Sequence, residues 1–144
     1  MESDPGAGPV VVDSGAWVAF LRSPDSAQGK ETARLIRDDR ARVVGVVVCE
    51  LLQGARSDLA LRQLEELLRA LAFLETGWDS WRRAGRLGRD LRRRGRTVPL
   101  SDLVVAATAL DHGAAVFSTD EHFDWIPGLR RHAPEERPRG ARGR

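Results

Sequence analysis

The stretch VVVDSGAWVAFLR, residues 10–22, joins a short apolar run to a helix-forming sequence, and a carboxylate lies at the junction. The three valines are β-branched and uninterrupted, which is typical of a buried parallel strand. Ser14 is a candidate N-cap for a helix over residues 14–22. Asp13 cannot be buried without a partner, because an unpaired charge loses its hydration there. The stretch therefore predicts a strand, a helix and an acid that must bind something.

Apolar runs that are followed by a helix or by an acid recur along the chain. Residues 41–48 form an apolar run that passes into a helix closed by Gly54, and the run at 114–119 is followed by Asp120. Strands that alternate with helices pair in parallel, with helices on both faces of the sheet. We therefore expect an α/β fold with three layers, α/β/α, and a mainly parallel central sheet. Further expected elements are a short strand at 71–75 and helices near 26–39, 58–70, 78–94 and 99–113, the last with Ser101 as a candidate cap.

Length and composition limit the class of protein. With 144 residues the chain is expected to form one domain around one compact core. The single cysteine, Cys49, excludes an internal disulfide framework and is expected to be a small buried hydrophobe. The N-terminus lacks the pattern of a secretory signal, and no apolar stretch approaches the roughly 18 residues that span a bilayer. We expect a cytoplasmic protein without membrane contact, whose residues 1–9 and basic tail 133–144 are disordered.

The net charge of +2 hides local basic segments. The last fifteen residues contain six arginines and two glutamates, and the segment 82–96 contains eight arginines and one aspartate. On the helix expected at 78–94, one face contains arginines and the opposite face Ala84, Leu87 and Leu91. Arginine suits phosphate, so this face is a candidate RNA-binding surface, although a GC-rich coding sequence, which favours arginine codons, explains any single arginine equally well. Its residues are Arg82, Arg86, Arg89 and Arg93.

Four acids occupy positions that an α/β fold brings together. Asp13 and Asp120 follow expected strands, whereas Glu50 and Asp102 lie near the starts of apolar helices. Ligands of open parallel sheets bind at the carboxyl ends of the strands. Four converging carboxylates would repel one another unless a cation joined them, and oxygen ligands favour Mg²⁺ or Mn²⁺ over zinc. Taken singly, each acid has a simpler explanation. Asp13 could be no more than a helix cap, and Asp102 with Ser101 could be no more than the acidic start of a helix.

The segments around these acids carry a family resemblance. VVVDSGAWVAFL, VVVCELLQGAR, PLSDLVVAATAL and FSTDEHF resemble, in order and spacing, the four acidic motifs of PIN-domain ribonucleases, especially the VapC-type toxins of bacterial toxin–antitoxin pairs. The resemblance runs from Val10 to Leu129 and implies a PIN-like nuclease domain over residues 10–132. It implies Mg²⁺-dependent hydrolysis of RNA, with Mn²⁺ as a substitute, to 5′-phosphate and 3′-hydroxyl ends. An antitoxin protein and a homodimer are the partners it implies.

The resemblance also assigns roles to individual residues. Asp13, Glu50 and Asp102 would bind the metal directly or through water, and Asp120 would complete the catalytic pocket. Ser118 or Thr119, two adjacent hydroxyls, would help to hold the site. The RNA, its cut site, the number of metal ions and the identity of the antitoxin stay open.

Other interpretations remain beside this one. The chain could be a PIN-like RNA-binding or protein-binding module without catalysis, although such a module has no need for four convergent acids. A phosphate-accepting receiver domain requires a late lysine, and the only lysine is Lys30. Trp78 and Trp81 suit packing in the core or in a dimer better than stacking on bases. His122 lies close to the acids in sequence and is a minor candidate for substrate contact.

Overall fold

The centre of the fold is a parallel β-sheet. The computed structural model describes residues 6–134, and in this range four strands pair in the order β3-β2-β1-β4, all parallel. In the register of the central strand, Val10 lies opposite Ala41 on one side and Ala115 on the other. The strands are β1 (Val10–Val12), β2 (Ala41–Val44), β3 (Ala72–Leu74) and β4 (Ala115–Phe117).

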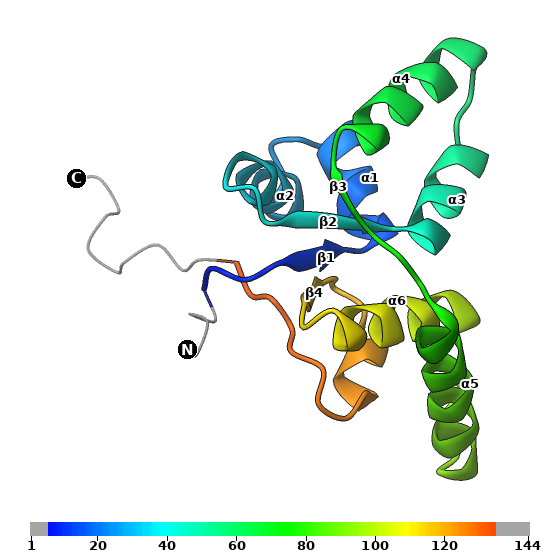
Figure 1. The fold of residues 1–144 in the computed structure, drawn as a ribbon. Helices are drawn as coiled ribbons and strands as arrows, with labels where there is room; N and C mark the ends of the chain where they lie inside the picture. Colours follow the sequence, from blue (N-terminus) through cyan, green and yellow to red (C-terminus); the bar gives the residue numbers. More distant parts are fainter. Residues whose placement is uncertain (1–5, 135–144) are drawn as a thin grey trace.

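Helices cover the sheet on both sides. In Figure 1, α1 and α2 lie together on one side of the strands, and α5 and α6 lie together on the other. This arrangement confirms the expected three-layer α/β fold with a parallel sheet. The helices are α1 (Ser14–Arg22), α2 (Ala27–Arg37), α3 (Gly45–Gln53), α4 (Asp58–Arg69), α5 (Trp78–Arg93) and α6 (Leu100–Asp111), and a 3-10 helix, η1, covers Glu121–Trp125.

The core forms where β1 meets α6. All three residues of β1 are fully buried, as a strand covered on both faces must be. Along α6, the seven consecutive residues from Leu103 to Ala109 are buried, so this helix lies inside the molecule rather than on its surface. Large side chains such as Trp17 and Phe123 complete the core. The first turn of α6, which contains Asp102, is therefore held rigidly beside the sheet.

Two expected helix caps are wrong. Asp13, not Ser14, caps α1: its backbone is extended, and its Oδ1 accepts a hydrogen bond of 2.8 Å from the Ser14 backbone N–H. Ser101 does not cap α6, because the helix begins one residue earlier, at Leu100, directly after Pro99. Proline fixes its own φ and so marks a helix start without a side-chain hydrogen bond. Ser101 consequently lies inside the first turn, next to Asp102.

The packing of α5 on α6 brings part of the arginine face near Asp102. Gly88 permits the close approach, because a Cβ atom there would lie 2.8 Å from Leu103 Cδ1 at the start of α6. At the other end, the Arg83 guanidinium donates to Asp111 Oδ1 at 2.8 Å. The two helices therefore run antiparallel, so Arg89 and Arg93 lie on the half of α5 nearer to Asp102.

The predicted disordered tails fall mostly on residues 1–5 and 135–144, which lie outside the described residues. Where the N-terminal segment is described, the Gly8 carbonyl accepts from Arg40 Nε at 2.9 Å and the Pro9 carbonyl accepts from the Ala115 N–H at 3.0 Å. Within residues 6–134, no helix combines the length and the apolar character that crossing a bilayer requires.

Candidate metal centre

Asp13 and Ser118 connect the carboxyl ends of the neighbouring strands β1 and β4. Asp13 is almost fully buried, and its Oδ2 accepts a hydrogen bond of 2.8 Å from Ser118 Oγ. Ser118 Oγ in turn accepts from the Asp120 backbone N–H at 3.0 Å, which fixes the loop after β4. The neighbouring Thr119 is exposed. Of the two adjacent hydroxyls, Ser118 is therefore the one that faces the acids.

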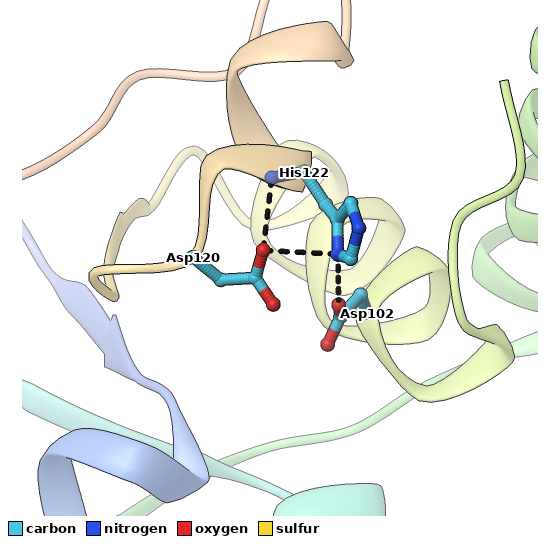
Figure 2. Close-up of side chains that lie close together, drawn as sticks. All are labelled: Asp102, Asp120 and His122. Atoms are coloured by element: carbon cyan, nitrogen blue, oxygen red, sulfur yellow. Dashed lines mark hydrogen bonds and ion pairs between the residues drawn. The ribbon is translucent and has the colours of Figure 1, made fainter.

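Asp102, Asp120 and His122 form the compact part of the site. Figure 2 shows one nitrogen of the His122 ring facing both carboxylates, which come from α6 and from the start of η1. His122 Nδ1 lies 2.9 Å from Asp120 Oδ1 and 3.3 Å from Asp102 Oδ2. One nitrogen or oxygen atom from each residue falls within 4.8 Å of the others. The arrangement thus offers three potential ligand atoms to one small cation.

Glu50 reaches the same region from α3 and lies beside Asp13. Its side chain is half-buried, and it also lines a groove of about 860 Å³. Burial, and secondarily the negative charge of Asp13, raises the pKa of Glu50 above its usual value. The structure therefore brings all four predicted acids to one end of the sheet, with Asp13 and Glu50 outside the compact group of Asp102, Asp120 and His122.

The acids impose a strong electrostatic conflict on Asp102. Burial raises the pKa of this carboxyl to about 6, with further contributions from the charges of Asp13 and Asp120, while the His122 hydrogen bond and charge act in the opposite direction. Within residues 6–134, the basic group that lies in ion-pair range of Asp102 and Asp120 is His122. Four carboxylates with one imidazole leave uncompensated negative charge, which a bound cation would neutralise.

The donor set fits a divalent cation that prefers oxygen ligands. Carboxylate oxygens with room for water are the surroundings that Mg²⁺ and Mn²⁺ accept. The raised pKa of Asp102, which burial and then the charges of Asp13 and Asp120 cause, shows that a negative charge is unfavourable at this carboxyl without a cation. Cys49 is exposed on α3 and is not a ligand. The expectation that it is buried is wrong, because Val47 and Leu51 occupy the inward positions of that helix. The residues present thus support a hard or borderline metal ion.

Arg131 is a residue of this region that the sequence did not single out. Its guanidinium donates to the Ser118 carbonyl oxygen and, at 3.0 Å, to Asp124 Oδ1. It therefore ties the loop containing Ser118 to η1. Asp124, a further acid of η1, is exposed and forms an ion pair with Arg131. No local pattern marks Arg131, because its partners depend on how the segment after η1 returns beside β4.

The arginine face and the tryptophans lie outside the acid site. The four arginines of this face are exposed on α5, opposite the buried Ala84 and Leu91, and their role in RNA binding stays a prediction. Trp78 and Trp81 are 78% and 51% exposed, so the expectation that they pack in the core is wrong. Packing in a dimer and stacking on bases stay predictions for both.

Comparisons with known proteins agree with this fold. The family model described as "PIN domain" matches residues 10–129. The chain is 34% identical over 122 residues to Ribonuclease VapC11 of Mycobacterium tuberculosis and to VapC ribonuclease Mb1587 of Mycobacterium bovis, covering 81% of this chain and 90% of each relative. The structure of VapBC2 from Rickettsia felis bound to a fragment of its promoter DNA matches 85% of this chain and 96% of that chain, with a TM-score of 0.74 and 17% identity. The chain belongs to the PIN domain family.

Proposed function

We propose that the protein is a metal-dependent endoribonuclease that hydrolyses RNA phosphodiester bonds. The observation that carries this proposal is the convergence of Asp13, Glu50, Asp102 and Asp120 at one end of the parallel sheet, with a single imidazole against their charge. Such a cluster costs stability in the metal-free protein. A structural role does not explain this cost, whereas a site that binds a cation and a phosphate does.

Each residue has a role that its contacts support. Asp102 and Asp120 would hold the divalent cation, Mg²⁺ or Mn²⁺, with Asp13 behind them. Glu50 would bind this cation directly or through a water molecule. When bound, such a cation acidifies a water molecule and neutralises the charge that develops on the phosphate oxygens. Ser118 holds Asp13 and the Asp120 backbone in register through its two hydrogen bonds.

The biological setting is proposed from the relatives. The two curated relatives are named as VapC ribonucleases, and solved structures with this fold include a toxin–antitoxin complex from Klebsiella pneumoniae and the sarcin–ricin loop-cleaving toxin VapC20 of Mycobacterium tuberculosis. We extend these properties to this chain as an RNA-cleaving toxin of the cytoplasm. An antitoxin protein would restrain it, and it would form a homodimer.

The test is cleavage of total RNA by the purified protein with and without chelator. Mg²⁺ or Mn²⁺ is expected to support cleavage, and excess EDTA to stop it until metal is returned. An Asp13→Asn preparation, purified in the same way, reports contaminating nucleases. Undiminished cleavage in EDTA contradicts the metal requirement. Failure of the metal-loaded protein to cut any RNA would favour the PIN-like module that binds RNA or protein without catalysis.

The partner proposal has a separate test. Beside Glu50, the groove of about 860 Å³ is lined by exposed apolar residues that include Val18 and Leu21. Such a groove, next to the catalytic acids, suits an apolar segment of an inhibitory protein. Leu21→Glu is expected to prevent copurification with the antitoxin from the adjacent reading frame while cleavage persists. Copurification undiminished by this change would exclude the groove as the docking surface.

A further inference from the structure

His122 is the basic side chain in contact with the proposed metal ligands, and its ring is held in a fixed direction. Its backbone N–H donates to Asp120 Oδ1 at 3.0 Å, and its ring meets the Trp125 ring edge to face, with centroids 5.2 Å apart. The Arg96 guanidinium covers the Trp125 ring, 4.8 Å from its centroid. These contacts aim Nδ1 into the space between the two carboxylates (Figure 2).

The distances in this group suit ligands of one ion. When each ligand lies about 2.1 Å from an octahedral metal, adjacent ligand atoms lie about 3 Å apart. His122 Nδ1 lies 2.9 Å from Asp120 Oδ1 and 3.3 Å from Asp102 Oδ2, close to that separation. The same distances also suit a hydrogen bond from Nδ1–H to a carboxylate. The experiment must therefore separate a ligand from a hydrogen-bond donor.

We propose that His122 is itself a metal ligand, through Nδ1, to the ion bound by Asp102 and Asp120. The proposal rests on the metal-dependent function proposed above and specifies the kind of metal. Imidazole nitrogen binds first-row transition ions well and Mg²⁺ poorly. The site therefore prefers Mn²⁺ over Mg²⁺ and prefers Co²⁺ over Mg²⁺ more strongly still. A site made of carboxylates alone would show a smaller preference.

The variant that separates the two roles is His122→Asn. The asparagine amide can donate a hydrogen bond from roughly the position of Nδ1, but it offers no imidazole lone pair to a metal. The matched control is His112→Asn, because His112 lies at the far end of α6 and contacts the Glu75 carbonyl instead. The third histidine, His132, is bound to Glu31. A nitrogen signal from a bound metal can therefore be assigned to His122.

Two readouts test the proposal without any RNA. Electron spin echo modulation of the Mn²⁺-loaded protein is expected to show a coordinated ¹⁴N in wild type and in His112→Asn, and none in His122→Asn. Calorimetric titration is expected to show that His122→Asn lowers Co²⁺ affinity at least about tenfold while Mg²⁺ affinity changes much less. Loss of nitrogen modulation together with a reduced Co²⁺ to Mg²⁺ preference supports the proposal.

Other outcomes overturn it in distinguishable ways. If wild type binds Mn²⁺ in a manner that Asp102→Asn abolishes, yet shows no nitrogen modulation, His122 is a hydrogen-bond donor and the ribonuclease proposal stands. An unchanged metal preference in His122→Asn leads to the same conclusion. If wild type binds no Mn²⁺, both this proposal and the metal-dependent function fail.

Discussion

Two clusters of charged side chains in this molecule each contain a nearly buried acid but differ in the ratio of acidic to basic groups. The first, the Glu31 cluster, consists of Glu31, Arg34 and His132, and its buried carboxylate lies 2.9 Å from Arg34 and 2.8 Å from His132. The second, the acid cluster, consists of four carboxylates and one histidine: Asp13, Glu50, Asp102, Asp120 and His122. Both join distant parts of the chain and contain an acid that is nearly buried. Uncompensated charge, more than burial, therefore distinguishes the functional site.

The difference assigns opposite energetic roles to the two clusters. In the Glu31 cluster, one acid has two basic partners, which fix the segment after η1 against α2 and support the fold. In the acid cluster, repulsion makes the metal-free fold less stable than its packing would allow, and a bound cation removes that cost. Removing an acid from the acid cluster should therefore stabilise the metal-free fold, whereas removing Glu31 from the Glu31 cluster should destabilise it.

The largest expected effect is on catalysis by Asp102→Asn. The substitution is nearly isosteric but removes one charge from the metal ligands, so RNA cleavage and growth inhibition should fall by at least about a hundredfold. In EDTA at pH 7 the variant should melt about 3–5 °C higher than wild type, because relief of repulsion is worth about 1 kcal/mol after allowance for solvent screening. Cleavage assays and thermal melts measure the two halves.

The matched control for Asp102→Asn is Asp111→Asn at the other end of α6. Asp111 accepts hydrogen bonds from Ser80 and Arg83, so its loss should lower stability and leave cleavage intact. If Asp102→Asn instead melts well below wild type and cuts normally, Asp102 is a structural residue of the helix start, and the contrast between the clusters disappears.

The next effect is on stability through Glu31→Gln. Removing this charge leaves Arg34 and His132 together in a nearly buried place without their acid, which should lower the free energy of unfolding by about 2–3 kcal/mol. Urea unfolding measures this loss, with the exposed Glu65→Gln on α4 as a control expected to change stability by less than about 0.5 kcal/mol. Cleavage well below the melting temperature should be unchanged. A loss of cleavage in folded Glu31→Gln would show that the two clusters are coupled.

A smaller effect is the pH dependence of stability in EDTA. Folded Asp102 keeps its proton up to a pKa of about 6, whereas the unfolded chain releases it near 3.8. The folded state therefore binds more protons between these values, so this stabilisation is complete below pH 4 and is lost as the pH rises through 6. Urea unfolding measures the free energy of unfolding of wild type and of Asp102→Asn. The wild-type value minus the variant's value should fall by about 1 kcal/mol between pH 4 and pH 7. A difference independent of pH would contradict the proposed repulsion.

The smallest effect concerns the arginine face of α5, whose charges belong to neither cluster. Arg89 and Arg93 lie on the half of α5 nearer to Asp102, whereas Arg82 is already 3.5 Å from Asp79. Replacing Arg89 and Arg93 with glutamate should reduce the salt dependence of RNA binding by about one unit of slope. The pair Arg82 and Arg86, changed in the same way, should have less effect. An unchanged slope in both would make this face an ordinary solvated surface.

Much of the fold was predictable because it depends on local pattern. Short apolar runs followed by acids marked β1 and β4, and the helices followed from apolar spacing and terminal glycines. The cap of α1 stayed open between Asp13 and Ser14, because both are good capping residues in adjacent positions and only the backbone conformation decides between them. Cys49 was misjudged because an apolar neighbourhood in sequence does not fix which side of a helix a residue occupies.

The acid site was predictable in composition but not in detail. Parallel strands bring their carboxyl ends together, so four acids after strands or at helix starts could be expected to meet. The choice of Ser118 over Thr119 and the contacts of His122 depend on the turn between β4 and η1, which no periodic pattern encodes. Arg131 was unforeseen because one of its partners is a backbone carbonyl, which carries no sequence signal, and both partners meet it only through the return of the segment after η1 beside β4.

The hydrogen bond from Ser118 to Asp13 joins residues 105 positions apart, and this has a consequence during protein synthesis. A chain is made from its N-terminus, so Asp13, Glu50 and α1 leave the ribosome long before β4 exists. Until Ser118 and Asp120 have been added, Asp13 lacks the partner that orients it and the cation lacks one of its carboxylates. The acid cluster therefore cannot assemble on the growing chain before β4 and the turn after it have been made.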